Sequence, residues 1–314
     1  MTSERTKIGA ESIKVRGRSK SSEPHFYFWI FAAICLAFWV PIRDLIVFSL
    51  SHDYGSHILL IAPLSIFLVY LNRHEIFSNL PIRLNPKAII GSSGLFLLGL
   101  IFLLLSKYQL VSEEKLSLEI LSVVILWISA FVFCYGRESF VSARFPLLFL
   151  LLLVPIPEFV VKKSIFALQA GSSDVAYGLL RILSVPVLKE GFVLRLPRID
   201  LEVAKECSGI RSSLALLVTL LFAGQFLLRS RWRKLLLVLA SVPILVIKNG
   251  IRIVTIYMLT TYVNPGFLHG KLHRSGGILF YLLGLLAMIP VIFLLRRNEG
   301  DDLKTSLVPS CPSE

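Results

Sequence analysis

The chain has 314 residues, of which 55% are hydrophobic, and it carries a formal net charge of +13. A soluble domain of this length could not bury so much apolar surface, so the composition excludes an ordinary water-soluble protein and indicates several membrane-spanning helices. The positive charge is typical of lysine and arginine in cytoplasmic loops, whereas nucleic-acid binding would need a basic soluble face with aromatic platforms.

The chain divides into two polar tails and one long apolar part. Residues 1–24 are basic and polar, and we expect them in the cytoplasm, followed by a retained anchor because no small-x-small cleavage site follows the first apolar run. Residues 25–297 are predicted to form one membrane domain, and residues 298–314 a disordered cytoplasmic tail. About eight apolar runs approach the length of a span: 26–42, 57–71, 88–106, 117–135, 142–158, 207–228, 235–257 and 275–295.

The distribution of basic residues sets the orientation of these segments. The loops richest in lysine and arginine, above all residues 229–234, are predicted to lie inside, and the short loops poorer in these residues outside. This assignment is consistent when both termini are cytoplasmic. The protein is therefore predicted to be integral to the cytoplasmic membrane.

One predicted outer segment, residues 158–206, is much longer than the others. Its first half, residues 159–183, mixes apolar and polar residues and is interpreted as an amphipathic or re-entrant helix. A membrane-spanning helix there would reverse the orientation of every later segment. The basic cluster at 229–234, which is expected inside, argues against it. The second half predicts a hairpin with strands at 185–188 and 192–196 and a turn at 189–191, then a strand at 199–203, all above the hydrocarbon region. The predicted fold is all-α and polytopic, with this small β-segment between spans five and six.

Three chemically versatile residues fall at the outer ends of the last three predicted spans. Cys207 begins span six, Arg252 lies about one turn from the end of span seven, and His273 stands at the start of span eight. Short loops make these helices neighbours. A thiol at a helix N-terminus is favoured as thiolate, an imidazole can serve as general acid and base, and a guanidinium can stabilise an oxyanion. The three residues together predict a cysteine acyl-transfer site.

The neighbours of these residues fit the same chemistry. Cys207 lies between two polar residues, Glu206 and Ser208, and the carboxylate of Glu206 opposes thiolate formation. Arg211 follows Cys207 by four residues, on the same helical face, and can offset that carboxylate. Asn249 precedes Arg252 by about one turn and could donate a hydrogen bond to it or to a substrate.

Each of these residues also has a structural interpretation. Cysteines in membrane helices, such as Cys35 and Cys134, are usually apolar fillers. An arginine near a helix end can simply reach the interface, as Arg252 could, and His273 can cap its helix. His269, four residues earlier, is a rival for the role of His273.

The motifs in this order resemble the exosortase/archaeosortase family of membrane cysteine enzymes. They are Cys-Ser-Gly-Ile-Arg at 207–211, Asn-Gly-Ile-Arg at 249–252 and His-x-x-x-Gly at 273–277. In addition, the segment at 52–57 resembles the family's first outer loop, and Pro155 and Pro157 resemble its proline pair. The resemblance covers about residues 26–295. Some family members carry a further C-terminal domain, whereas this chain has only a short tail, to Glu314, after the eighth predicted span. Its subfamily therefore stays open.

The resemblance implies both a reaction and a substrate class. Family members are thought to cleave C-terminal sorting signals of exported proteins, each signal being a short motif such as Pro-Glu-Pro, a transmembrane helix and a basic cluster. The implied triad is Cys207, Arg252 and His273, with a thioester intermediate resolved by water or by an unknown acceptor nucleophile. No metal or cofactor is expected.

Other interpretations stay open at this point. His52, Asp53 and His57 are candidates for substrate binding at the mouth of the site and, as a weaker alternative, for a metal site. The chain could instead be a non-enzymatic membrane subunit of an exopolysaccharide or envelope assembly system. A transporter is disfavoured because the candidate residues gather at one face rather than near the midplane.

Overall fold

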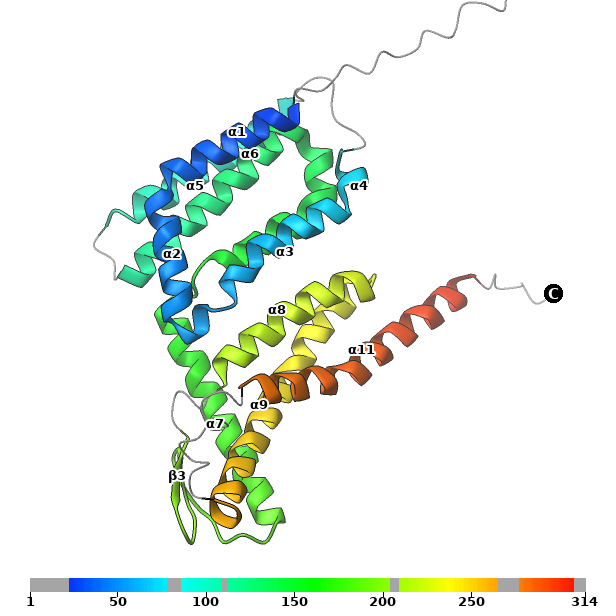
Figure 1. Ribbon diagram of the computed structural model, residues 1–314. Coiled ribbons are helices and arrows are strands. Elements are labelled where there is room, and N and C mark those ends of the chain that lie inside the picture. Colours follow the sequence, from blue (N-terminus) through cyan, green and yellow to red (C-terminus); the bar gives the residue numbers. More distant parts are fainter. Residues whose placement is uncertain (1–22, 78–85, 109–111, 204–208, 265–276, 308–314) are drawn as a thin grey trace, which may run out of the picture.

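The computed structural model describes residues 23–77, 86–108, 112–203, 209–264 and 277–307 (Figure 1). These residues are mostly helical, and a small sheet lies at one end of the molecule. The prediction of a helical membrane protein with a small β-segment is confirmed. Five described helices are long and apolar enough to cross a membrane, or up to six when a bent pair counts as one span, so the predicted eight spans are not confirmed.

The first predicted span is a bent pair of helices. α1 (Glu23–Ala37) and α2 (Trp39–Ser51) meet at an angle of 73°. A short 3-10 turn, η1 (Asp53–Gly55), follows, and then α3 (Ile58–Leu71) and α4 (Arg73–Phe77). α3 has only 14 residues, so it is too short to count among the five spans.

α6 (Ser112–Phe149) is the centre of the N-terminal half and is broken at Gly136. The backbone there has φ 80° and ψ 178°, which glycine adopts at little cost. Ser117 Oγ donates to the carbonyl of Pro155 over 2.9 Å, although a straight helix would separate residues 38 apart by roughly 57 Å. The two parts of α6 therefore fold back on each other, and the short turn η2 (Leu150–Leu153) leads back alongside α3.

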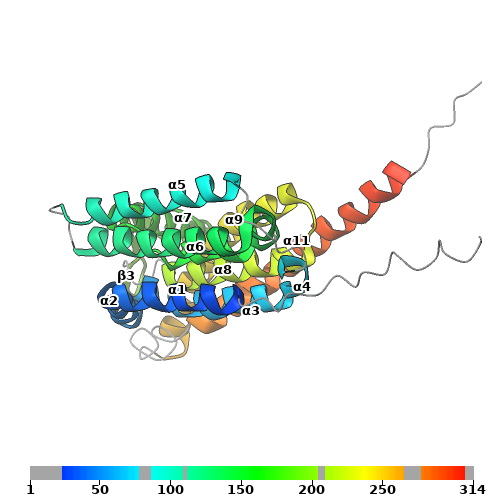
Figure 2. The same ribbon diagram turned by 90° about the horizontal axis from the view of Figure 1, so that it is seen from above.

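α6 packs between α1 and α5 (Pro86–Leu105), as the view from above shows (Figure 2). Small residues allow the close approach of α5, and two serine hydroxyls of α6, on Ser122 and Ser129, donate to backbone carbonyls of α5. A Cβ at Gly99 would lie 3.0 Å from the Leu126 side chain. The outward face of α5 is apolar, as expected of a helix that faces lipid.

The C-terminal half consists of four longer helices. They are α7 (Glu158–Ile182), α8 (Ile210–Leu227), α9 (Arg231–Tyr262) and α11 (Gly277–Leu307). α9 contacts the other three, and the second half of α11 extends away from the bundle (Figures 1 and 2). α7 confirms the predicted helix over 159–183 and is not among the helices apolar enough to span.

The sheet is an antiparallel meander of three short strands. β1 (Leu188–Glu190) pairs with β2 (Val193–Arg195), and β2 pairs with β3 (Asp200–Glu202). The predicted turn at 189–191 is placed too early, because Lys189 and Glu190 belong to β1 and the chain reverses at Gly191, which has φ +61°. Alternate side chains of the sheet, such as Leu194, Leu201 and Val203, pack with α7 and the second half of α9.

Candidate functional site

Arg252 lies on α9 and is almost completely buried, with 7% of its surface exposed. The sequence predicts it about one turn from the outer end of a span at 235–257, but the helix itself is longer than that predicted span. α9 runs on to Tyr262, ten residues or roughly 15 Å further, because its last turns pack against the sheet. Arg252 is therefore an interior residue and not one that reaches the interface from a helix end.

The N-terminus of α8 lies against the same part of α9. Gly209 caps α8 in a left-handed conformation, with φ +72°, and a Cβ there would lie 2.9 Å from Asn249 Oδ1. Glycine is required both by this backbone conformation and by the close approach. The Asn249 amide donates to Ser172 Oγ of α7 over 3.0 Å, so Asn249 connects α7, α8 and α9.

A buried lysine joins this group. Lys248 is 3% exposed, and its Nζ lies 2.5 Å from Ser212 Oγ. The Ser212 hydroxyl donates in turn to the carbonyl of Gly209 over 3.0 Å. Lys248 was not among the residues predicted from the sequence, although it is the one charged residue in the run 235–251 and a charge within an apolar run signals function. No sequence signal marked Ser172.

The start of α11 also approaches Arg252. The guanidinium carbon of Arg252 lies 5.9 Å from the centre of the Phe280 ring, in the first turn of α11. Such a contact between a cation and an aromatic face is favourable in a water-poor setting. Arg252 thus lies near the first turn of α11, and about one helical turn from Asn249, which meets the start of α8.

Several predicted site residues fall outside the described ranges. These are Glu206, Cys207, Ser208, His269 and His273. In the sequence Cys207 precedes Gly209 by two residues, and His273 precedes Phe280 by seven. Their proximity to Arg252 stays a prediction, as does the proposed role of Arg211, which lies exposed in the first turn of α8.

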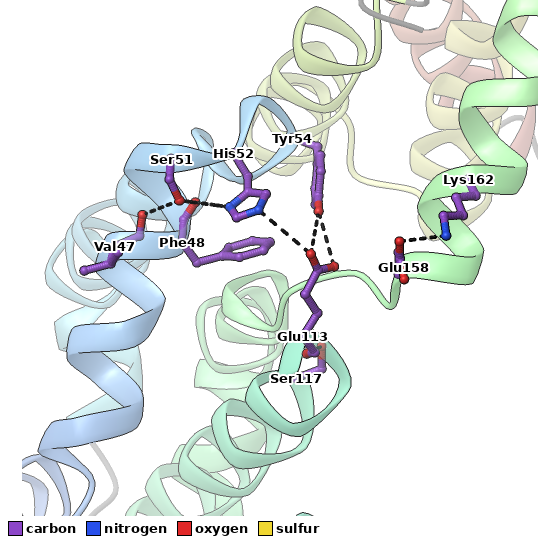
Figure 3. Close-up of polar contacts among 9 residues, drawn as sticks. All are labelled: Val47, Phe48, Ser51, His52, Tyr54, Glu113, Ser117, Glu158 and Lys162. Atoms are coloured by element: carbon purple, nitrogen blue, oxygen red, sulfur yellow. Dashed lines mark hydrogen bonds and ion pairs between the residues drawn. The ribbon is translucent and has the colours of Figure 1, made fainter. Parts of the chain in front are cut away.

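A second polar group lies where η1 meets the first turn of α6 (Figure 3). His52 Nε2 lies 3.8 Å from a carboxylate oxygen of Glu113, and the Tyr54 hydroxyl donates to the same carboxylate over 3.3 Å. The ring of Phe48 stacks on His52 with centroids 4.4 Å apart. Burial, together with the negative charge and hydrogen bond of Glu113 and the charge of Glu158, raises the pKa of Tyr54 to about 12.

The three candidate residues of the first outer loop thus have different surroundings. His52 faces Glu113, whereas His57, the residue before α3, is half-buried, and this burial lowers its pKa. The side chain of Asp53 lies outside what the structure describes. Within the described ranges no group of three or more histidine, cysteine or acidic side chains is arranged to hold a metal ion.

The two groups are linked through α8. η1 contacts this helix, whose first turns carry Ser212. The loop that ends at Glu158 leads into α7, which supplies Ser172, and Glu158 itself pairs with Lys162 at 2.7 Å (Figure 3). The first outer loop is therefore in contact with the helix that follows Cys207.

Comparison with known protein families gives a match over residues 49–290, to the family of transmembrane exosortases. The matched region covers most of the chain and includes both polar groups. This chain belongs to the transmembrane exosortase family. Searches among curated proteins and among solved structures return no significant match. The exosortase family assignment confirms the resemblance seen in the sequence and, with the apolar helices, identifies an integral membrane protein.

Proposed function

We propose that this exosortase is a cysteine protease or transpeptidase that cleaves C-terminal sorting signals of exported proteins. The observation that carries the proposal is the burial of Arg252 near the start of α11 and about one turn from Asn249, which meets the start of α8, in a chain that belongs to this family. These are the helices that follow Cys207 and His273 in the sequence. A buried guanidinium at such a junction suits the stabilisation of a developing negative charge.

The chemistry assigns one role to each member of the triad. The Cys207 thiolate attacks the carbonyl carbon of the scissile peptide bond, and Arg252 stabilises the resulting oxyanion. His273 gives a proton to the leaving amine as the carbon–nitrogen bond breaks, which leaves a thioester on Cys207. Water or an amine acceptor then attacks the thioester carbonyl, gives its proton to His273 and releases the Cys207 thiolate.

Family membership supports the proposed substrate class. A signal with its own transmembrane helix would dock laterally among the helices, so that its cleavage point meets a nucleophile at the membrane edge. His52, Asp53 and His57 are proposed to line the entrance to this site, since η1 contacts α8. The active site is proposed to face outward from the cytoplasmic membrane, with both chain termini inside.

The proposal is tested by following a tagged protein with such a C-terminal signal in cells. Wild type is compared with Cys207→Ala, Arg252→Ala and His273→Ala at matched expression, with His269→Ala as the control that separates the two histidines. We expect shortening of the substrate by wild type and by His269→Ala, and full-length substrate with the three triad variants. Normal processing by Cys207→Ala would overturn the proposal and favour a non-enzymatic subunit of an envelope or exopolysaccharide system.

A further inference from the structure

Lys248 is a buried cation for which neither the triad nor the family assignment gives a role. Its side chain is enclosed by α8 and α11, since a Cβ at Gly284 would lie 3.2 Å from its Cδ and 3.3 Å from Leu216. No carboxylate pairs with it among the described residues, where its hydrogen bond goes to Ser212 Oγ. A buried ammonium without an acidic partner is costly, so it is expected where function needs a charge.

The hydrogen bonds run in one direction, toward the N-terminus of α8. The Ser212 hydroxyl donates to the Gly209 carbonyl, so its oxygen accepts from Lys248 Nζ. This direction argues against Ser212 as a nucleophile activated by a lysine base, because the hydroxyl hydrogen faces the carbonyl and not the amine. Lys248 instead holds Ser212, and Ser212 holds the left-handed turn at Gly209.

Among the described residues, the charge that acts on Lys248 has the same sign. Arg252, one turn later on α9, acts on it electrostatically. The first turn of α8 carries Arg211, and α11 has no charged residue between 277 and 295. On α7, Asp174 is exposed and pairs with Lys189. The described surroundings of this helix start are therefore positive and poor in water, which favours an anion there and offsets the carboxylate of Glu206, which lies outside the described residues.

We propose that Lys248 is a positioning residue of the acyl-transfer site, holding the Gly209 turn through Ser212 and lowering the pKa of the Cys207 thiol by its charge. This inference rests on the proposed function. It adds a fourth residue to the site, one that acts on the nucleophile without touching the substrate.

The test measures how fast Cys207 reacts with iodoacetamide as a function of pH, in a purified protein whose other cysteines are alanine. Removing the charge in Lys248→Met should slow alkylation about threefold to tenfold at pH 7 and move the midpoint of the profile to higher pH. Lys248→Arg, which keeps the charge, should keep the midpoint near that of wild type. Ser212→Ala also keeps the charge and should lower processing more than it moves the midpoint.

The matched control is Lys234→Met, in the first turn of α9. Lys234 also donates to a neutral side chain, Gln225, but lies 14 residues or roughly 21 Å from Lys248. This variant should leave the profile unchanged. Should Lys248→Met fail to fold, Lys248→Gln, whose amide can still donate to Ser212, gives the same comparison.

Identical midpoints in wild type and a folded, uncharged Lys248 variant would overturn the inference. Processing at the wild-type rate by Ser212→Ala would also overturn it, because Lys248 would then not hold the Gly209 turn through Ser212. The alkylation profile does not depend on processing, so failure of this inference is distinguishable from failure of the proposed acyl-transfer function.

Discussion

At the scale of single residues, the burial of Arg252 limits what can replace it. Its planar guanidinium offers several donors in a fixed arrangement and stacks near the Phe280 ring, whereas a lysine ammonium is a point charge. Charge alone is therefore not expected to support the proposed role of stabilising the oxyanion.

Arg252→Lys should lower the rate of substrate processing by about 100-fold or more while the protein still folds. Rates are measured with the tagged substrate, and folding by thermal unfolding in detergent. Arg195→Lys, at an exposed position on β2 that pairs with Glu190, is the control and should process normally. A rate within a few-fold of wild type for Arg252→Lys would contradict the role given to the guanidinium.

The burial of His57 at the start of α3 predicts a pH dependence of stability. Burial lowers the pKa of His57 below its ordinary value of 6.5, so the unfolded chain binds a proton more readily than the folded protein. The stabilisation is present above pH 6.5 and is lost as pH falls below it. His57→Gln should flatten the dependence of the melting temperature on pH between 5 and 6.5, and the exposed His74→Gln should not. Equal slopes in wild type and His57→Gln would contradict this.

At the scale of elements, the contact between α7 and α9 positions the site. A Cβ at Gly250 would lie 2.4 Å from Val175 Cγ1, so the two helices touch where Asn249 reaches Ser172. α7, the helix predicted as an amphipathic segment, therefore contributes Ser172 to the polar group around Asn249.

Gly250→Ala should therefore lower stability, by about 2 kcal/mol, because neither backbone can easily move. Thermal unfolding in detergent measures the effect, and adding Val175→Ala should restore part of it. Gly178→Ala, where an added Cβ meets nothing within 4 Å, should be neutral or stabilising. A neutral Gly250→Ala would show that the helices are less closely packed than described.

Much of the helical architecture could be predicted from the sequence because apolar length is a strong local signal. The helix over 159–183 and the three-strand segment were predicted from alternation and turn residues. The sequence could not give the reversal within α6 at Gly136 or the length of α9, because tertiary packing decides both. The motif pointed to Arg252, but it did not predict that Arg252 would be buried inside the helical bundle. Lys248 and Ser172 were missed because their role depends on contacts between separate helices.

At the scale of the whole molecule, the sheet and the connection between α8 and α9 lie at different ends of the bundle (Figure 1). The proposed topology places the sheet outside the cell and the basic connection inside. Single cysteines at exposed positions, Glu202→Cys in β3 and Ser230→Cys before α9, test this in a background without other cysteines.

A membrane-impermeant maleimide should label Glu202→Cys in intact cells and label Ser230→Cys only after permeabilisation. Both should be labelled equally in detergent, which controls for local accessibility. The reverse pattern would place the site on the cytoplasmic side and contradict access to exported proteins.

The central claim is that Cys207 forms a thioester with its substrate, and trapping this intermediate tests it most directly. The enzyme and a tagged substrate are co-expressed, membranes are quenched in acid, and the covalent conjugate is detected with and without neutral hydroxylamine. We expect a conjugate that is lost in Cys207→Ala and cleaved by hydroxylamine. Processing that continues without Cys207, or a conjugate that forms on another residue, would contradict the account.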